Sequence, residues 1–176
     1  MSSINASALS AFNQQMQSTP ANTDGGYDTW FPEDGVYDCS VTSIFMKECN
    51  APEWVENEKV DHEGVLIKFT FQLIDDPGSP ASPRSFEGSP FILPVNGMDA
   101  FKTEQGQKKL VKTLGRLKGH LTVLLGMSEC PDLHGSLGEI ESRLQTESIE
   151  ARVKCSSWTS QSNKTYNTEY VNSLLG

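Results

Sequence analysis

The sequence has no long run of apolar residues and no recognisable export signal. A helix that crosses a membrane needs about 18 or more consecutive apolar residues, and no such stretch is present. The first residues also lack the basic segment followed by an apolar segment that marks a secretory signal. We therefore expect a soluble, cytoplasmic protein without a membrane partner.

Cysteines are few and lie far apart, without any C-x-x-C pair. This spacing indicates neither a disulfide framework nor a zinc site. Cys130 and His134 have the spacing of a metal-ligand pair, but the rest of a ligand set is missing. We expect free, mostly buried thiols, and neither a metal ion nor another cofactor. The cysteines are Cys39, Cys49, Cys130 and Cys155.

The common catalytic motifs are missing as well. The sequence contains no G-x-x-x-x-G-K-[ST], G-x-S-x-G or H-E-x-x-H, so nucleotide hydrolysis and the usual hydrolase reactions lack their minimum parts. The neighbouring carboxylates of Asp75 and Asp76 precede Pro77 and Gly78, a pattern typical of a turn. We expect a protein that is not an enzyme.

Basic residues are outnumbered by acids. Fourteen Lys and Arg stand against 23 Asp and Glu, which gives a net charge of −9, and this sign argues against a nucleic-acid partner. Their distribution is uneven, however, because residues 102–120 hold six of the basic side chains and one acid, Glu104. Charges more than about 8 Å apart are largely screened at physiological salt, so this segment can form a local positive surface.

By composition the chain divides into a tail and a domain. Residues 1–26 are rich in Ser, Asn, Ala and Gln, which is typical of mobile segments. Residues 27–176 are long enough to bury one sizeable core and short for two. We predict a flexible N-terminal tail followed by a single domain.

Three strands are predicted in the first half of the domain. They are marked by β-branched and aromatic residues or by alternation of apolar and polar residues. Gly88 and Pro90 indicate a bulge or a sheet edge within the third strand. The acidic segment 50–64, between the first two, is predicted to be a solvated loop. The predicted strands are 36–46, 65–73 and 84–95.

After these strands the period lengthens to that of a helix. Leucines recur at steps of three and four over residues 110–125, and Gly126 is suited to a left-handed C-cap. Gly115 and Gly119 share one face of this helix. Because glycine has no side chain, the pair permits close approach of another backbone at that face.

A short helix and two strands complete the domain. Ser136 and Glu139 have the spacing of a capping box for a helix that ends at Leu144. Alternation returns over residues 149–158, and a last strand is predicted at 166–175 after a turn.

The resulting element order is β-β-β-α-β-β, that of the OB-fold, a small five-stranded Greek-key barrel. Each strand of such a barrel buries one face and displays the other, which fits the alternation of these strands. We therefore predict an all-β OB-fold barrel with helices inserted between strands 3 and 4. An antiparallel sandwich that carries a helix is the alternative.

Four segments, GVYDCSV, VLIKFTFQL, LVKTLGRLKGHL and NKTYNTEYV, lie in this order within residues 30–175. Their layout resembles that of the OB-fold single-stranded DNA-binding proteins encoded by phages. The resemblance implies a role in phage DNA replication or recombination in the cytoplasm of an infected or host bacterial cell. It further implies replication or recombination proteins as candidate partners and a homo-oligomer as a candidate state. Such proteins often recruit partners through an acidic C-terminal tail, whereas this chain ends in VNSLLG.

Binding of single-stranded DNA requires cations along the backbone path and flat rings on which bases can stack. Outer strand faces and loops supply four candidate cations, and the predicted helix supplies three, which contact either phosphates or an acidic loop of a neighbouring subunit. Each candidate ring has the core as its alternative place, and Trp54 and Phe86 are further candidates. The predicted DNA-binding residues are Lys68, Arg84, Arg152, Lys154, Lys108, Lys112, Arg116, Trp158, Tyr166 and Tyr170.

The sequence leads to two hypotheses of different classes. The first is a non-catalytic protein that binds single-stranded DNA by backbone electrostatics and base stacking. The second is an acidic protein-interaction or virion-assembly β-barrel that binds no nucleic acid, which the net charge favours.

Overall fold

A computed structural model describes residues 30–129 and 132–176. The chain divides into two units, residues 1–30 and 31–176, and the second holds all the elements named here. The predicted tail, residues 1–26, lies outside the described residues, as does Cys130. In chain order the elements are β1 (Gly35–Val55), β2 (Glu58–Leu73), β3 (Ser85–Glu87), β4 (Phe91–Pro94), the short 3-10 helix η1 (Met98–Ala100), α2 (Glu104–Leu125), α3 (Leu133–Leu144), β5 (Ile149–Thr159) and β6 (Thr165–Leu174).

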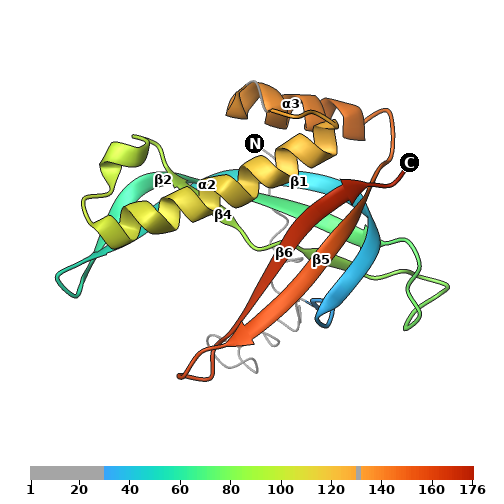
Figure 1. Ribbon diagram of the computed structural model, residues 1–176, viewed down its shortest axis with the longest axis horizontal. Coiled ribbons are helices and arrows are strands. Elements are labelled where there is room, and N and C mark those ends of the chain that lie inside the picture. The colour runs from blue at the N-terminus through green and yellow to red at the C-terminus, as the bar shows by residue number, and fades with distance from the viewer. Residues whose placement is uncertain (1–29, 130–131) are drawn as a thin grey trace, which may run out of the picture. The chain divides into compact units, whose positions relative to one another are not determined.

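Six antiparallel strands form one sheet, which α2 crosses on one side (Figure 1). The hydrogen-bonded order is β3-β2-β1-β5-β6, and β4 also pairs with β2. β1 is central because it pairs with both β2 and β5. A register shift between Val41 and Ser43 marks a bulge in β1, and bulges bend a strand and increase its twist. The fold is mostly β, as predicted. The two long helices also lie where they were predicted, between the strands of the first half and the last two strands.

The first two strands are longer than predicted, because residues 50–64 do not form a loop. They contain the end of β1, a two-residue turn and the start of β2. The turn residues Glu56 and Asn57 have φ angles of 49° and 67°, and positive φ at both positions is what a tight hairpin turn requires. The loop prediction was wrong because most of these charged side chains lie on the exposed positions of paired strands.

The predicted third strand is divided at the residues that indicated an irregularity. β3 and β4 both pair with β2, and residues 88–90 separate them. Pro90 has no N–H group to donate to a ladder. A Cβ on Gly88 would lie 2.5 Å from Oε1 of Glu169, so this close approach requires glycine. The prediction of a single third strand was therefore wrong, and the irregularity that Gly88 and Pro90 indicated is a break between two strands.

The long helix is confirmed, and it begins earlier than its leucine run. Thr103 precedes α2 and accepts a hydrogen bond from the N–H of Gly106. At the other end Gly126 adopts φ 66° and ψ 31°, the left-handed C-cap conformation that the sequence predicted.

The second helix ends at Leu144 as predicted, but its N-terminal cap differs. Asp132 is the N-cap and accepts a hydrogen bond from the N–H of Gly135. Ser136 therefore lies inside the first turns of α3, where it is buried, and the predicted capping box with Glu139 was wrong. No helix within the two described ranges combines the length and the apolarity needed to cross a membrane.

The core lies between the sheet and α2. His120 of α2 packs against the rings of Phe69, Phe71 and Phe91 from β2 and β4. A second cluster at the N-terminal end of α2 joins Leu110 to β1. Burial of each large apolar side chain contributes about 1.5–3 kcal/mol, which holds α2 across the sheet. Alternation predicted nine inward residues in β2 and β5. Val65 is half-buried, and the other eight are buried: Ile67, Phe69, Phe71, Leu73, Ile149, Ala151, Val153 and Cys155.

The sheet is open, and the predicted closed barrel of five strands is not seen. β3 and β6 are the ends of its hydrogen-bonded order, and no ladder joins β6 to β3 or β4 in the described part of the chain. The break at residues 88–90 leaves two short strands on this side of β2, which offers β6 no continuous partner.

Candidate nucleic-acid interface

One side of the β5–β6 hairpin is turned away from the core. Val153 and Cys155 are buried, so their neighbours along β5 point to the opposite side. Figure 1 shows the two strands side by side in orange and red. We call the outer side the β5–β6 face; the pairs Lys154–Tyr170, Ser156–Thr168 and Trp158–Tyr166 lie opposite one another across it, and Arg152 extends it along β5.

The three predicted rings of this hairpin all lie outside the core. Trp158 is 59% exposed, Tyr170 45% and Tyr166 39%. The rings of Trp158 and Tyr166 are stacked, with centroids 4.7 Å apart. Of the two further candidates, Trp54 is exposed at the far end of β1, whereas Phe86 is buried. Phe86 stacks on Phe71 within the core, so it offers no surface to a base.

Three cations accompany these rings. Lys154 is exposed and forms no ion pair with any described residue. Arg152 donates to Asp38 at 2.9 Å, so its charge is largely compensated. The Lys164 ammonium lies 5.3 Å from the centroid of the Tyr166 ring. Lys164 was not among the residues predicted from the sequence, although its place in the turn immediately before the last strand was a usable signal.

The two candidate cations of the preceding strands bind carboxylates of their own chain. Lys68 donates to Glu87 at 2.8 Å. Arg84 donates two hydrogen bonds to the Asp76 carboxylate, from Nε and Nη2, each at 2.8 Å. These side-chain hydrogen bonds from Arg84 hold the pKa of Asp76 well below its usual range. Asp76 also accepts from the N–H of Gly78, so this pair fixes the turn that the sequence predicted here.

The candidate cations of α2 differ in their availability. Lys108 forms an ion pair with Glu104 at 2.6 Å. The side chain of Arg116 is only 13% exposed and donates to Glu169 at 3.0 Å. Its guanidinium also lies 3.9 Å from the centroid of the Phe91 ring. Lys112 is exposed. Of the three, Lys112 is therefore the best placed to meet an external ligand.

A groove of about 670 Å³ separates α2 from β6. We call it the α2–β6 groove. Gly115 and Gly119 lie on its helical side, and a Cβ on either would meet nothing within 4 Å. The close backbone approach that these glycines permit is not used by any described residue, because they border open space. The groove is also lined by Lys109, Lys112, Arg116, Thr168 and Tyr170.

A buried carboxylate links β6 to the break between β3 and β4. Glu169 is fully buried and accepts from the N–H of Ser89 at 2.6 Å and from Arg116. Nε2 of His120 lies 3.2 Å from the same carboxylate, and Arg116 also donates to the carbonyl of Ser89. These side chains join the two parts of the sheet where no ladder does. Glu169 was not among the residues predicted from the sequence, although an acid at an inward position of the last strand was a signal.

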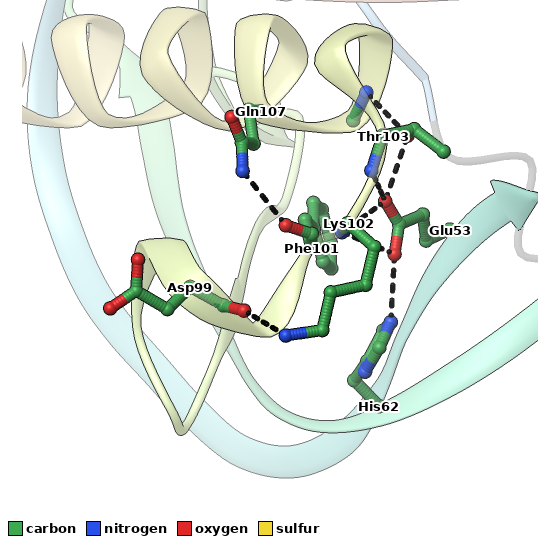
Figure 2. Close-up of polar contacts among 8 residues, drawn as sticks. Glu53, His62, Asp99, Phe101, Lys102, Thr103 and Gln107 are labelled. Carbon is green, nitrogen blue, oxygen red and sulfur yellow. Dashed lines mark hydrogen bonds and ion pairs between the residues drawn. The ribbon is translucent and has the colours of Figure 1, made fainter.

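A second buried carboxylate holds the start of α2 (Figure 2). Glu53 of β1 accepts from the N–H groups of Lys102 and Thr103 and from the Thr103 hydroxyl, at 2.7–3.0 Å. Nε2 of His62 lies 3.1 Å away. Burial by itself raises the pKa of Glu53, but the hydrogen bonds from Thr103, Lys102 and His62 outweigh it and lower the pKa to about 2. Glu53 is therefore ionised and tied to the helix entrance.

The remaining polar groups of interest are the buried thiols and the possible metal ligands. Burial raises the pKa of the Cys39 and Cys155 thiols to about 12, so neither is a nucleophile near neutral pH. No group of three or more His, Cys, Asp or Glu residues that could hold a metal ion occurs among residues 30–129 and 132–176.

Comparisons with known proteins found no relative of this chain. No protein-family model, no curated protein and no solved structure matches the chain.

Proposed function

We propose that this protein binds single-stranded DNA without catalysis and acts in phage DNA replication or recombination. The observation that carries the proposal is the β5–β6 face, on which three exposed rings stand beside cations. A base that stacks on an aromatic ring gains about 1–3 kcal/mol, and neighbouring Lys and Arg side chains attract the phosphates. This combination fits an unpaired strand, whose bases are free to stack.

The rings form two stacking positions along the hairpin, which we call stations. Trp158 and Tyr166 make the first, with Lys164 beside it. Tyr170 makes the second, with Lys154 directly opposite. Tyr170 lies four positions after Tyr166, which is about 14 Å along the strand at about 3.4 Å per residue. A strand of DNA laid along the hairpin therefore meets a ring and a cation together at both stations.

Two acidic groups, Asp34 and Asp38, also lie near the face. Asp38 is paired with Arg152, and Asp34 accepts from the N–H and hydroxyl of Ser157. Lys154 and Lys164 form no ion pair with a described residue. Because distant charges are screened at physiological salt, these two lysines can attract phosphates locally despite the net charge of −9.

We also propose that the sheet is an OB-fold in which side chains, and not a ladder of backbone hydrogen bonds, join β6 to the segment between β3 and β4. Its support is the pairing of β1 with both β2 and β5 and the helices inserted before β5. The Glu169 carboxylate and Arg116 bridge β6 to Ser89, where a closed barrel would have a ladder. OB-folds are partly open barrels, and the loop between their last two strands contacts oligonucleotides. Here that loop carries Lys164.

A protein-assembly function is the second candidate. Phe45 and Met46 are neighbours in β1 and are 50% and 45% exposed. Successive residues of a strand point to opposite faces, so these two side chains do not form one patch, and the support for a protein partner is the net charge of −9.

Titration of a labelled oligo(dT) with the protein separates the two candidates. We expect binding at micromolar protein or below in about 50 mM salt, with a log–log salt slope of about −0.7 per phosphate contact. A duplex of the same length, whose bases are already stacked, should bind more weakly. Undetectable binding of oligo(dT) at micromolar protein would contradict DNA binding and leave the assembly function.

A further inference from the structure

We infer that the α2–β6 groove is a second segment of the DNA path and holds the sugar–phosphate backbone of the strand beyond the hairpin. This inference rests on the proposed function, because it extends the β5–β6 face into a longer binding surface. It assigns the groove a ligand class, single-stranded nucleic acid, and a role distinct from that of the hairpin, where bases stack.

The groove continues the β5–β6 face without a gap. Thr168 and Tyr170 belong to both, since they lie opposite Ser156 and Lys154 on the face and also line the groove. A strand that stacks a base on Tyr170 therefore stands at the entrance of the groove. Its next nucleotides pass between β6 and α2.

The charge of the groove matches a polyanion. Lys109 and Lys112 are exposed at its edge and form no ion pair within the described residues. The charge of Arg116 is balanced by the buried Glu169 carboxylate. Lys108, which is paired with Glu104, is not among the residues lining the groove. The groove thus presents two uncompensated positive charges on a chain whose net charge is −9.

The space in the groove is not used by the protein itself. Glycine within a helix is less stable than alanine, and at Gly115 and Gly119 no neighbouring atom lies close enough to require it. A larger side chain would fit the backbone at either position and would fill the groove. The two glycines thus leave room for a ligand at the face where Lys109 and Lys112 stand.

The same geometry supplies a variant that should fold well and bind poorly. Gly115→Leu fills the groove and favours the helix, so its thermal midpoint should equal or exceed that of the wild type. Gly138→Leu is the matched control, because Gly138 is also exposed in a helix with nothing within 4 Å of its Cβ and does not line the groove. The double variant Lys109→Gln with Lys112→Gln removes the charges without filling the space.

The test compares oligo(dT) of about 5 and about 16 nucleotides, near the two ends of the range that one OB-fold covers. The readout is the ratio of the two affinities. We expect Gly115→Leu and the double lysine variant each to lower this ratio about fivefold or more, with little change for the short oligonucleotide. The double variant should also reduce the salt slope for the long one by about 1.4. Gly138→Leu should change nothing.

The ratio decides between the outcomes. If Gly115→Leu and the double lysine variant keep the wild-type ratio, the inference is overturned and the groove serves another ligand, such as an extended peptide along the β6 edge, while the β5–β6 face stands. If the wild-type protein binds neither oligonucleotide, the proposed function itself fails, and the inference fails with it.

Discussion

Trp158 and Tyr166 stack across the β5–β6 ladder, with ring planes only 18° apart. Cross-strand aromatic pairs of this kind stabilise a sheet by about 0.2–1 kcal/mol. Trp158 nevertheless keeps more than half of its surface exposed. The pair therefore holds the end of the hairpin in shape and at the same time offers a flat apolar surface to a ligand.

Replacement of Trp158 by alanine should weaken binding of oligo(dT) about fivefold or more, because one stacked base is worth about 1–3 kcal/mol. The loss of the cross-strand contact costs at most about 1 kcal/mol of stability, so the domain should stay folded. Fluorescence anisotropy of a labelled oligonucleotide measures the affinity, and circular dichroism checks the fold.

Trp54→Ala is the matched control for this prediction. Trp54 is 65% exposed and also stands opposite a lysine, Lys59. It lies at the end of β1 that does not pair with β5. We expect an affinity within about twofold of the wild type, since no stacked base is lost. An equal loss for Trp54→Ala and Trp158→Ala would show that the site is not confined to the hairpin.

Lys154 and Arg152 should differ in their effect on the salt dependence. Lys154→Gln removes an uncompensated charge, so the log–log slope should become shallower by about 0.7. Arg152→Gln should change the slope less, because Asp38 already neutralises much of the arginine charge. Affinities measured over a series of salt concentrations give both slopes, and a larger change for Arg152→Gln would contradict the assignment.

Glu53→Gln should destabilise the domain by about 1–3 kcal/mol at pH 7, because a buried carboxylate that accepts several hydrogen bonds is lost. The pKa of Glu53 is lowered from 4.5 to about 2 in the folded state. Its stabilisation is therefore complete above about pH 4.5 and is lost as the pH falls toward 2.

Urea unfolding at several pH values between 7 and 2.5 tests this pattern. The difference between wild type and Glu53→Gln should shrink as the pH falls below about 4.5. Glu58→Gln, an exposed change at the start of β2, serves as the control and should have little effect at any pH. A difference that stays constant down to pH 2.5 would mean that Glu53 is not held ionised.

Glu169→Gln should cost about 3–5 kcal/mol, because it leaves the buried Arg116 guanidinium without its counter-charge. The comparison is Asp38→Asn, which breaks the surface pair with Arg152 and should cost about 1 kcal/mol or less. Urea unfolding measures both. Equal costs would show that the Glu169 carboxylate does not join β6 to the break between β3 and β4.

Local patterns predicted much of this fold correctly. Alternation gave the inward residues of β2 and β5, and from the same alternation Lys154 and Trp158 follow as outward residues. Leucine spacing and Gly126 gave the body and the end of α2. These features depend on neighbours in the chain, and such neighbours are visible in the sequence.

Features that depend on distant partners could not be predicted in this way. Burial of Glu53 or Glu169 is favourable only because Thr103 and Arg116, about fifty residues away, supply the donors. Ion pairs with Asp76 and Glu169 likewise occupy Arg84 and Arg116, which were predicted from the sequence to bind DNA. A pattern of residue types shows which side chains are charged, but the fold decides which charges are already matched.

Ultraviolet cross-linking of oligo(dT) to the wild-type protein, followed by identification of the modified residues by mass spectrometry, tests the central claim most directly. We predict cross-links at Trp158, Tyr166 and Tyr170, the exposed rings of the β5–β6 face. Cross-links confined to other regions, such as Trp54 or Phe45, would contradict the assignment of this face as the site where DNA bases stack.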